Sequence, residues 1–138
     1  MLNNPRNATL ATSVTVTKAG LCLTNDSTNN KLKLAAEGDV VVGISADESE
    51  RDSSGLVAGG LVSYYPLGSV IMVASKTGQT YTTGLKVYVG TTSVNDGYAY
   101  DDSNSSARKL LGIYVGEGTV TTADGDLIPV MTAGAATA

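Results

Sequence analysis

Histidine, tryptophan and phenylalanine are absent from this chain of 138 residues. Without histidine there is no Ser/His/Asp or Cys/His nucleophilic relay, no histidine-ligated zinc site and no histidine general base. The one cysteine, Cys22, has no partner for an intrachain disulfide, and we interpret it as a buried reduced thiol. Charged residues make up only 16% of the chain, which argues against a helical bundle. These absences exclude most common enzyme designs, and we expect no enzyme.

Positive charge is scarce and scattered. The net charge is −4, and the nine Lys and Arg residues form no stripe, which disfavours binding to nucleic acid or to an anionic membrane. No run approaches the roughly 20 apolar residues of a membrane-spanning helix. The first residues lack the apolar core of a secretory signal. We therefore expect no nucleic-acid partner and no membrane association, and we expect the protein to be made and assembled in a cytoplasm.

The chain is instead rich in hydroxyl residues, glycine and short apolar runs. Its 17 Thr and 13 Ser suit exposed strand faces and turns. Alternating or β-branched runs predict eight or nine strands, at residues 13–17, 21–23, 31–34, 40–44, 56–65, 70–74, 85–90, 110–116 and 127–131. Asn95-Asp96-Gly97 predicts a tight hairpin turn. This spacing is typical of a single-domain all-β fold, a small barrel or a sandwich, with little or no helix.

Both ends of the chain differ from this pattern. Residues 1–12 are rich in Asn, Ala and Thr and show neither a helical nor a strand period, so we interpret them as a flexible N-terminal arm. Such an arm either frays or docks onto a partner. The β-domain is expected over residues 13–132, and residues 133–138 form a loose C-terminal tail.

Carboxylates offer the remaining acid-base chemistry. They lie in segments rich in Gly, Ser and Asn, and none sits within an apolar run where burial would raise its pKa. A glycosidase-like pair is therefore not expected. Oxygen ligands for calcium are available at Asp96, Asp101 and Asp102, or at Asp124 and Asp126, but without EF-hand spacing. We interpret these loops as solvated turns and predict no catalytic, metal or cofactor-binding residue, although calcium binding by a loop stays open.

All seven aromatic residues are tyrosines, and two of them, Tyr64 and Tyr65, are adjacent. Adjacent strand residues point to opposite faces, so one ring is expected to pack inward and the other outward. Tyrosine is enriched at protein interfaces. Tyr64 and Tyr65 are therefore candidates for an oligomer or partner interface.

Five glycine-containing, strand-like segments follow one another along the chain: Glu37-Gly38-Asp39-Val40-Val41-Val42-Gly43-Ile44, Gly68-Ser69-Val70-Ile71-Met72-Val73-Ala74, Gly84-Leu85-Lys86-Val87-Tyr88-Val89-Gly90, Leu111-Gly112-Ile113-Tyr114-Val115-Gly116 and Asp124-Gly125-Asp126-Leu127-Ile128-Pro129-Val130. Together they resemble the small capsid decoration, or cement, proteins of tailed bacteriophages, over residues 35–131. The resemblance implies a compact barrel or β-tulip-like domain, trimers or other small clusters on the outer surface of the virion head, and no catalytic residues.

The resemblance also implies a role, which is to stabilise a capsid by bridging subunits of the major capsid protein. An N-terminal arm can do this by adding a strand to an exposed sheet edge, with contacts expected from Leu2, Asn3, Pro5, Arg6 and Leu10. Deleting residues 1–12 is then expected to leave a folded domain that no longer binds capsids. Two alternatives stay open: a β-sandwich adhesin or carbohydrate-binding module, and a head-fibre or tail protein. The absence of Trp argues against the carbohydrate-binding module.

Overall fold

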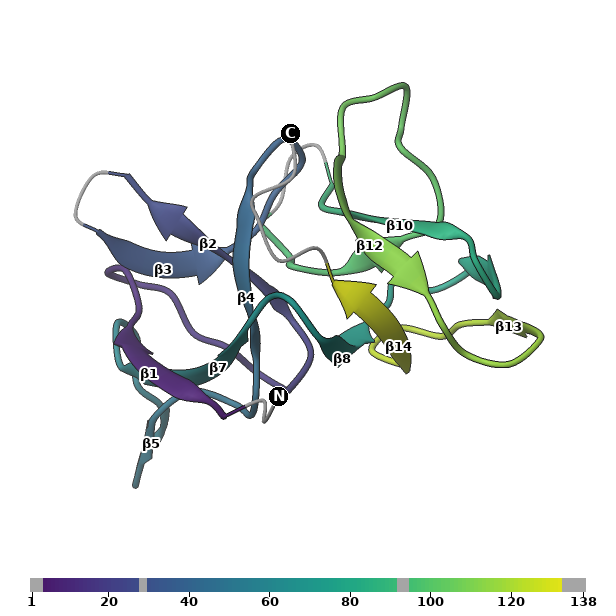
Figure 1. Cartoon of the computed structure of the whole chain (residues 1–138). Helices are drawn as coiled ribbons and strands as arrows, with labels where there is room; N and C mark the ends of the chain where they lie inside the picture. Colours follow the sequence, from purple (N-terminus) through teal and green to yellow (C-terminus); the bar gives the residue numbers. More distant parts are fainter. Residues whose placement is uncertain (1–3, 28–29, 92–94, 133–138) are drawn as a thin grey trace.

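The computed structural model describes residues 4–27, 30–91 and 95–132, and over these residues it is all-β, with no helix (Figure 1). One five-stranded sheet has the order β1-β7-β4-β2-β3 and a second has the order β11-β10-β12-β14-β8. The first comprises β1 (Arg6–Thr9), β7 (Leu61–Pro66), β4 (Val41–Ser45), β2 (Cys22–Asp26) and β3 (Lys31–Leu34). The second comprises β11 (Ala99–Tyr100), β10 (Lys86–Val89), β12 (Lys109–Tyr114), β14 (Leu127–Thr132) and β8 (Val70–Ala74). Two small ribbons pair β9 (Thr80–Thr82) with β13 (Thr119–Thr121) and β5 (Arg51–Asp52) with β6 (Gly55–Leu56).

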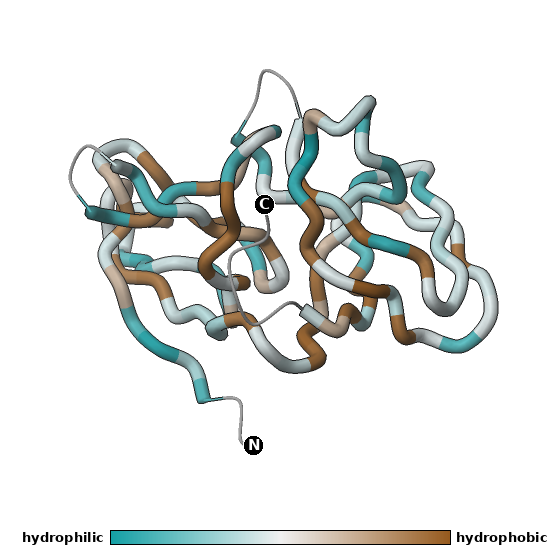
Figure 2. The backbone as a smooth tube through the Cα atoms, turned by 45° about the horizontal axis from the view of Figure 1, so that its top comes forward, coloured by the Kyte–Doolittle hydropathy of each residue, from teal (hydrophilic) through white to brown (hydrophobic). Residues whose placement is uncertain are grey.

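The two large sheets lie side by side and share a core (Figures 1 and 2). Ile44 of β4 belongs to one cluster with Val73 of β8 and Val130 of β14. β7 leads into β8 through residues 67–69, so the chain crosses directly from the first sheet to the second. In each sheet a single β-bridge joins the two outermost strands: Leu10 with Leu32 in the first sheet, and Ser75 with Ala99 in the second. Among the described residues, no continuous strand pairing closes either sheet into a barrel. This confirms the predicted all-β single domain in its two-sheet form.

The tight turn predicted at Asn95-Asp96-Gly97 is wrong, because residues 90–98 connect the antiparallel strands β10 and β11. Within this connection the φ of Gly97 is +70°, in the left-handed region that favours glycine. The Gly97 carbonyl accepts a hydrogen bond from the Cys22 N–H at 2.8 Å, and Asp96 Oδ1 accepts one from the Tyr98 N–H at 3.1 Å. The connection between β10 and β11 of the second sheet is thus also hydrogen-bonded to β2 of the first.

The predicted separation of an arm at residue 12 is wrong for residues 6–10. Arg6–Thr9 form β1, which pairs antiparallel with β7 from Leu61 to Tyr64. Leu10 is completely buried in the second core cluster, beside Val62. The Leu10 N–H donates to the Gly60 carbonyl at 2.9 Å. A polar strand can join a sheet edge through its backbone alone, without an apolar period in its sequence. Residues 1–3 and the predicted loose tail, 133–138, lie outside the described residues.

The strand predicted at residues 13–17 is also wrong. Val16 is buried, as its alternation with polar neighbours indicated. However, its backbone pairs with Ser49, whose Oγ accepts from the Val16 N–H at 2.9 Å and whose N–H donates to the Val16 carbonyl at 2.8 Å. One serine therefore supplies hydrogen-bond partners for both backbone polar groups of Val16, a buried residue that belongs to no sheet.

Three protonated groups are held in the core. Burial raises the pKa of Tyr100 to about 12 and also raises the pKa values of Tyr81 and Cys22. The Tyr81 hydroxyl lies 2.8 Å from Ser75 Oγ, which keeps it hydrogen-bonded while neutral. In each case desolvation penalises the charged form, so folding favours the protonated form.

Alkaline pH should therefore destabilise the protein. As pH rises, the unfolded chain loses these protons before the folded chain does. The stability that these three groups contribute is therefore constant up to about pH 9 and then falls through about pH 12. Urea unfolding between about pH 8 and about pH 11 should show the unfolding midpoint decreasing. Tyr81→Phe removes one of the titrating groups and should make the decrease shallower. A midpoint that does not change over this range would contradict the assignment.

Candidate protein-docking surface

Exposed apolar side chains gather at one end of the second sheet. Five of the seven large apolar side chains that are exposed among the described residues lie there, each between 42% and 47% exposed. They are Val70 and Met72 of β8, Leu127 and Met131 of β14, and Val115, which follows β12. We call these five residues the docking face. The other two, Val42 and Leu61, belong to the first sheet.

Strand register explains why these side chains share a face. Met131 lies opposite Val70 on one side and opposite Ile113 on the other, and residues directly opposite each other point to the same side of a sheet. Pro129 lies opposite Met72 in the next row. The alternate residues of β8 and β14 fill the core, so both strands are apolar on both faces. A contiguous exposed apolar patch of this kind marks an interaction site.

The edge of β8 beside this face has unpaired backbone groups. Pro129 has no N–H, and its carbonyl accepts from the Val115 N–H at 3.1 Å on the side away from β8. Met72, opposite Pro129, therefore directs its own N–H and carbonyl toward the open edge, and so does Val70 two residues earlier. Ala74 follows the same alternation, and its N–H donates to the Gly20 carbonyl at 2.8 Å. No described residue pairs with the backbone of Val70 or Met72 at this edge.

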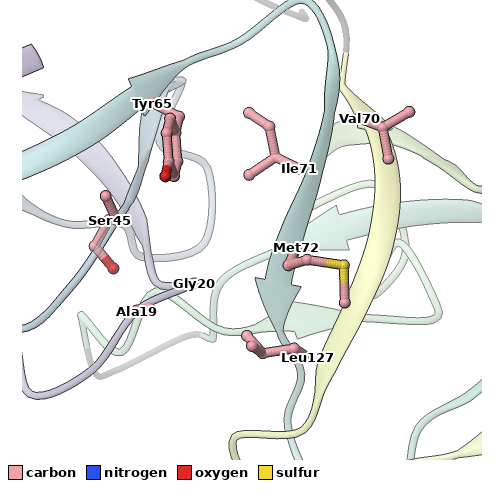
Figure 3. Close-up of a pocket in the computed structure, with 9 residues that line it drawn as sticks. Ala19, Gly20, Ser45, Tyr65, Val70, Ile71, Met72 and Leu127 are labelled. Carbon is pink, nitrogen blue, oxygen red and sulfur yellow. The ribbon is translucent and has the colours of Figure 1, made fainter. Parts of the chain in front are cut away.

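A groove of about 360 Å³ runs along this edge (Figure 3). Tyr65 and Ser45 stand across it from Ile71 and Met72. Its lining residues carry no charge: Ala19, Gly20, Ser45, Ala46, Tyr65, Val70, Ile71, Met72 and Leu127. We call this the β8 groove.

The wall of the β8 groove opposite β8 is firmly held. Ser45 Oγ accepts from the Leu21 N–H at 2.9 Å and donates to the Lys18 carbonyl at 2.9 Å. The Gly20 N–H donates to the Ser45 carbonyl at 2.8 Å. These bonds fix the 18–21 segment to β4, so the groove is preformed.

The two tyrosines predicted as an interface point to different clusters. Tyr65 packs against the core shared by the sheets and lines the β8 groove. Tyr64 packs against the second cluster, near Leu10 and Val62. Both rings are half-buried, so neither projects fully outward. Only Tyr65 is in position to contact a molecule bound in the groove.

The five residues predicted as arm contacts do not form one site. Pro5 and Arg6 are exposed, and Arg6 lies opposite Tyr64 at the end of β1. Leu10 is completely buried, so its predicted capsid contact is wrong: the side chain fills the second core cluster. Leu2 and Asn3 lie outside the described residues.

Three of the aspartates considered as calcium ligands accept hydrogen bonds from backbone N–H groups. Asp101 Oδ2 accepts from the Thr80 N–H at 2.8 Å, Asp124 Oδ1 accepts from the Thr77 N–H at 2.7 Å, and Asp126 Oδ2 accepts from the Ala123 N–H at 2.8 Å. Over residues 4–27, 30–91 and 95–132 no three acidic or cysteine side chains gather as a metal site. The same residues contain no helix able to cross a membrane.

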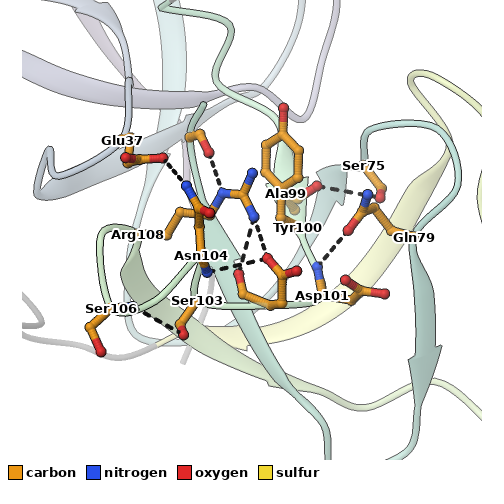
Figure 4. Close-up of polar contacts among 12 residues, drawn as sticks. Glu37, Ser75, Gln79, Ala99, Tyr100, Asp101, Ser103, Asn104, Ser106 and Arg108 are labelled. Atoms are coloured by element: carbon orange, nitrogen blue, oxygen red, sulfur yellow. Dashed lines mark hydrogen bonds and ion pairs between the residues drawn. The ribbon is translucent and has the colours of Figure 1, made fainter. Parts of the chain in front are cut away.

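The 101–108 loop is fastened by a polar network (Figure 4). The Arg108 guanidinium lies 3.7 Å from the centre of the Tyr100 ring, its Nε donates to the Gly90 carbonyl at 2.6 Å, and it pairs with Asp102. Asn104 Nδ2 donates to Glu37 Oε2 at 2.7 Å. These contacts hold three successive residues, Asn104, Ser105 and Ser106, at positive φ. The network thus ties Arg108 both to its own loop, at Asp102, and to Gly90 and Tyr100 outside it.

The docking face was not predicted from the sequence. Its residues lie in the runs 70–74 and 127–131, which a sequence alone indicates as strands buried on both faces. The available signal was the absence of any charge in an edge strand, because natural edges usually carry one. No protein-family model and no curated protein sequence matches the chain. We therefore infer the function of the docking face from its geometry.

Proposed function

We propose that this chain is a structural virion protein that binds the outer surface of a viral capsid and stabilises it by bridging subunits of the major capsid protein. The observation that carries the proposal is the docking face, an apolar sheet surface beside an unpaired strand edge. The centres of protein interfaces are depleted of charge in the same way. The order of glycine-punctuated strands that resembles capsid decoration proteins supports the same assignment.

The modest size of the docking face fits a repetitive partner. Five half-exposed side chains form a small contact compared with the roughly 800 Å² that each partner buries in a standard interface. A capsid presents the same site many times, and a homo-oligomer, which we propose as a trimer, engages several sites at once. Linked weak contacts then gain strength through effective concentration.

The carbohydrate-binding alternative has no comparable support. Binding of sugars usually relies on exposed aromatic platforms. All seven tyrosines lie within the described residues, and each is buried or half-buried. Nothing in the described residues favours a glycan over a protein partner.

Sedimentation with capsids tests the proposal. The purified full chain should co-sediment with expanded capsids of the virus that encodes it, and those capsids should withstand a higher temperature before they release their contents. Capsids without the protein are the control. Failure to co-sediment, together with binding on a glycan array, would support an adhesin instead.

A further inference from the structure

We propose that the β8 groove accepts one extended, uncharged segment of the capsid partner, which adds an antiparallel strand to β8 at Val70 and Met72. This inference rests on the proposed function for the source of the segment. It specifies the means of attachment: backbone hydrogen bonds at a sheet edge, with specificity from alternate side chains.

The backbone geometry carries the first step. Val70 and Met72 direct their N–H and carbonyl groups into the groove, two residues apart, as a strand edge presents them to a neighbour. Beyond them, the Gly20 carbonyl accepts from the Ala74 N–H at 2.8 Å. The protein thus already pairs one of the three edge residues with its own chain. The backbone N–H and carbonyl groups of the other two, Val70 and Met72, are able to bond to an added strand in the same way.

The shape of the groove limits what can enter. One end is bounded by the Gly20–Ala74 hydrogen bond and the other by residues 67–69, which join β7 to β8. Ser45, Ala46 and Tyr65 form the opposite wall. Because this wall faces β8 across the groove, we place a single extended segment, and not the folded sheet of a second copy, between the two sides.

The lining defines the chemistry of the segment. Because no charged side chain lines the groove, a charged residue entering it would lose water without gaining a partner. Alternate side chains of an added strand would lie beside Val70 and Met72 on the docking face, and the others would face Ile71 and Tyr65. An uncharged segment with apolar residues at alternate positions matches both sides.

The described chain has no segment free to serve as this strand. The strand nearest the N-terminus, β1, is already paired with β7, and Leu10 anchors it in the core. Among the described residues, a second copy would have to release a paired strand to donate it. The proposed function supplies a different source, and we therefore assign the donor to the capsid protein.

Amide hydrogen exchange on the full chain tests strand addition. The probe is a short capped peptide that alternates Val and Thr. At a peptide concentration about ten times its dissociation constant, exchange at the Val70 and Met72 amides should slow about tenfold. Exchange at Ile71 and Val73, which already pair with β14, should not change. Unchanged exchange at Val70 and Met72 would overturn the proposal.

Two N-methylated peptides, blocked at odd or at even positions, separate backbone pairing from side-chain binding. Only one of the two peptides should fail to slow exchange at the Val70 and Met72 amides, because an added strand pairs with β8 through the N–H groups of one edge. Equal binding by both peptides would overturn the proposal.

Met72→Pro removes an edge N–H at a position where proline is tolerated, and it should abolish the slowing of exchange at Val70, while Met72→Leu should keep it. The peptide pair decides the question even where Met72→Pro fails to fold.

Exchange measured on capsid-bound protein separates this inference from the proposed function. Slowed exchange at Val70 and Met72 on the capsid supports both. Capsid binding that leaves both amides unprotected refutes strand addition and leaves the proposed function standing. Peptide protection without capsid binding refutes the capsid as donor, and the proposed function with it.

Discussion

Replacing Leu10 with alanine should lower the free energy of unfolding by about 2–5 kcal/mol. Leu10 is completely buried and belongs to the cluster that contains Val16, Leu23 and Val62. The substitution removes its apolar contacts and leaves a cavity where β1 enters the core. Because domains of this size are stable by about 5–15 kcal/mol, a large share of the total would be lost.

Leu61→Ala is the matched control for this substitution. Leu61 lies in β7, the strand that pairs with β1, but its side chain is 54% exposed. Its replacement should change stability by no more than about 0.5 kcal/mol. Urea unfolding of both variants measures the difference. Equal effects of the two substitutions would show that residues 6–10 are not part of the folded domain.

The pairing of β1 and the burial of Leu10 change how the N-terminus should be tested. Deleting residues 1–12 removes β1 and Leu10 together, so we now expect it to destabilise the domain and not only to remove a contact. A deletion confined to residues 1–5 leaves β1 in place. It therefore separates any binding by the first residues from folding.

Met72→Asp combined with Met131→Asp should weaken capsid binding by about 100-fold or more. The two methionines lie on neighbouring strands of the docking face, and each is nearly half exposed. In a bound complex, each new carboxylate would lose its water without gaining a partner, and disruption at the centre of an interface costs at least about 2 kcal/mol. Stability of the free protein should change little, because both carboxylates remain accessible to water in it.

Leu61→Asp controls for added charge at an exposed leucine outside the docking face. It should bind capsids as the unmodified chain does. Co-sedimentation over a range of capsid concentrations gives the affinities, and urea unfolding confirms that each variant is folded. An equal loss for Leu61→Asp and for the double variant would mean that net charge, and not the docking face, governs binding.

Local signals predicted much of the fold. The alternating run at 31–34 is a strand, and Gly97 has the predicted positive φ, although the connection around it is longer than a tight turn. Sequence fails where pairing is non-local or carried by polar groups. The hydroxyls of Thr80 and Thr121 lie 3.1 Å apart across β9 and β13, strands of three residues each that are about 40 residues apart in the chain.

The candidate site was harder to predict than the strands. A run such as Val70-Ile71-Met72-Val73 indicates burial on both faces, yet only Ile71 and Val73 enter the core. Whether the other face is covered depends on strand order, since β8 is an edge strand and no described element covers Val70 or Met72. Strand order depends on long-range pairing, which one sequence does not reveal. Tyr65 was a candidate interface residue because of its aromatic character, whereas its position in the β8 groove was not predicted.

A cryo-electron microscopy reconstruction of the virus particle proposed to carry this chain tests the central claim most directly. The account predicts density for the protein on the outer capsid surface, with the docking face turned toward the major capsid protein and a capsid strand alongside Val70 and Met72. A particle with no density for the protein on its capsid, or with this face turned toward solvent, would contradict it.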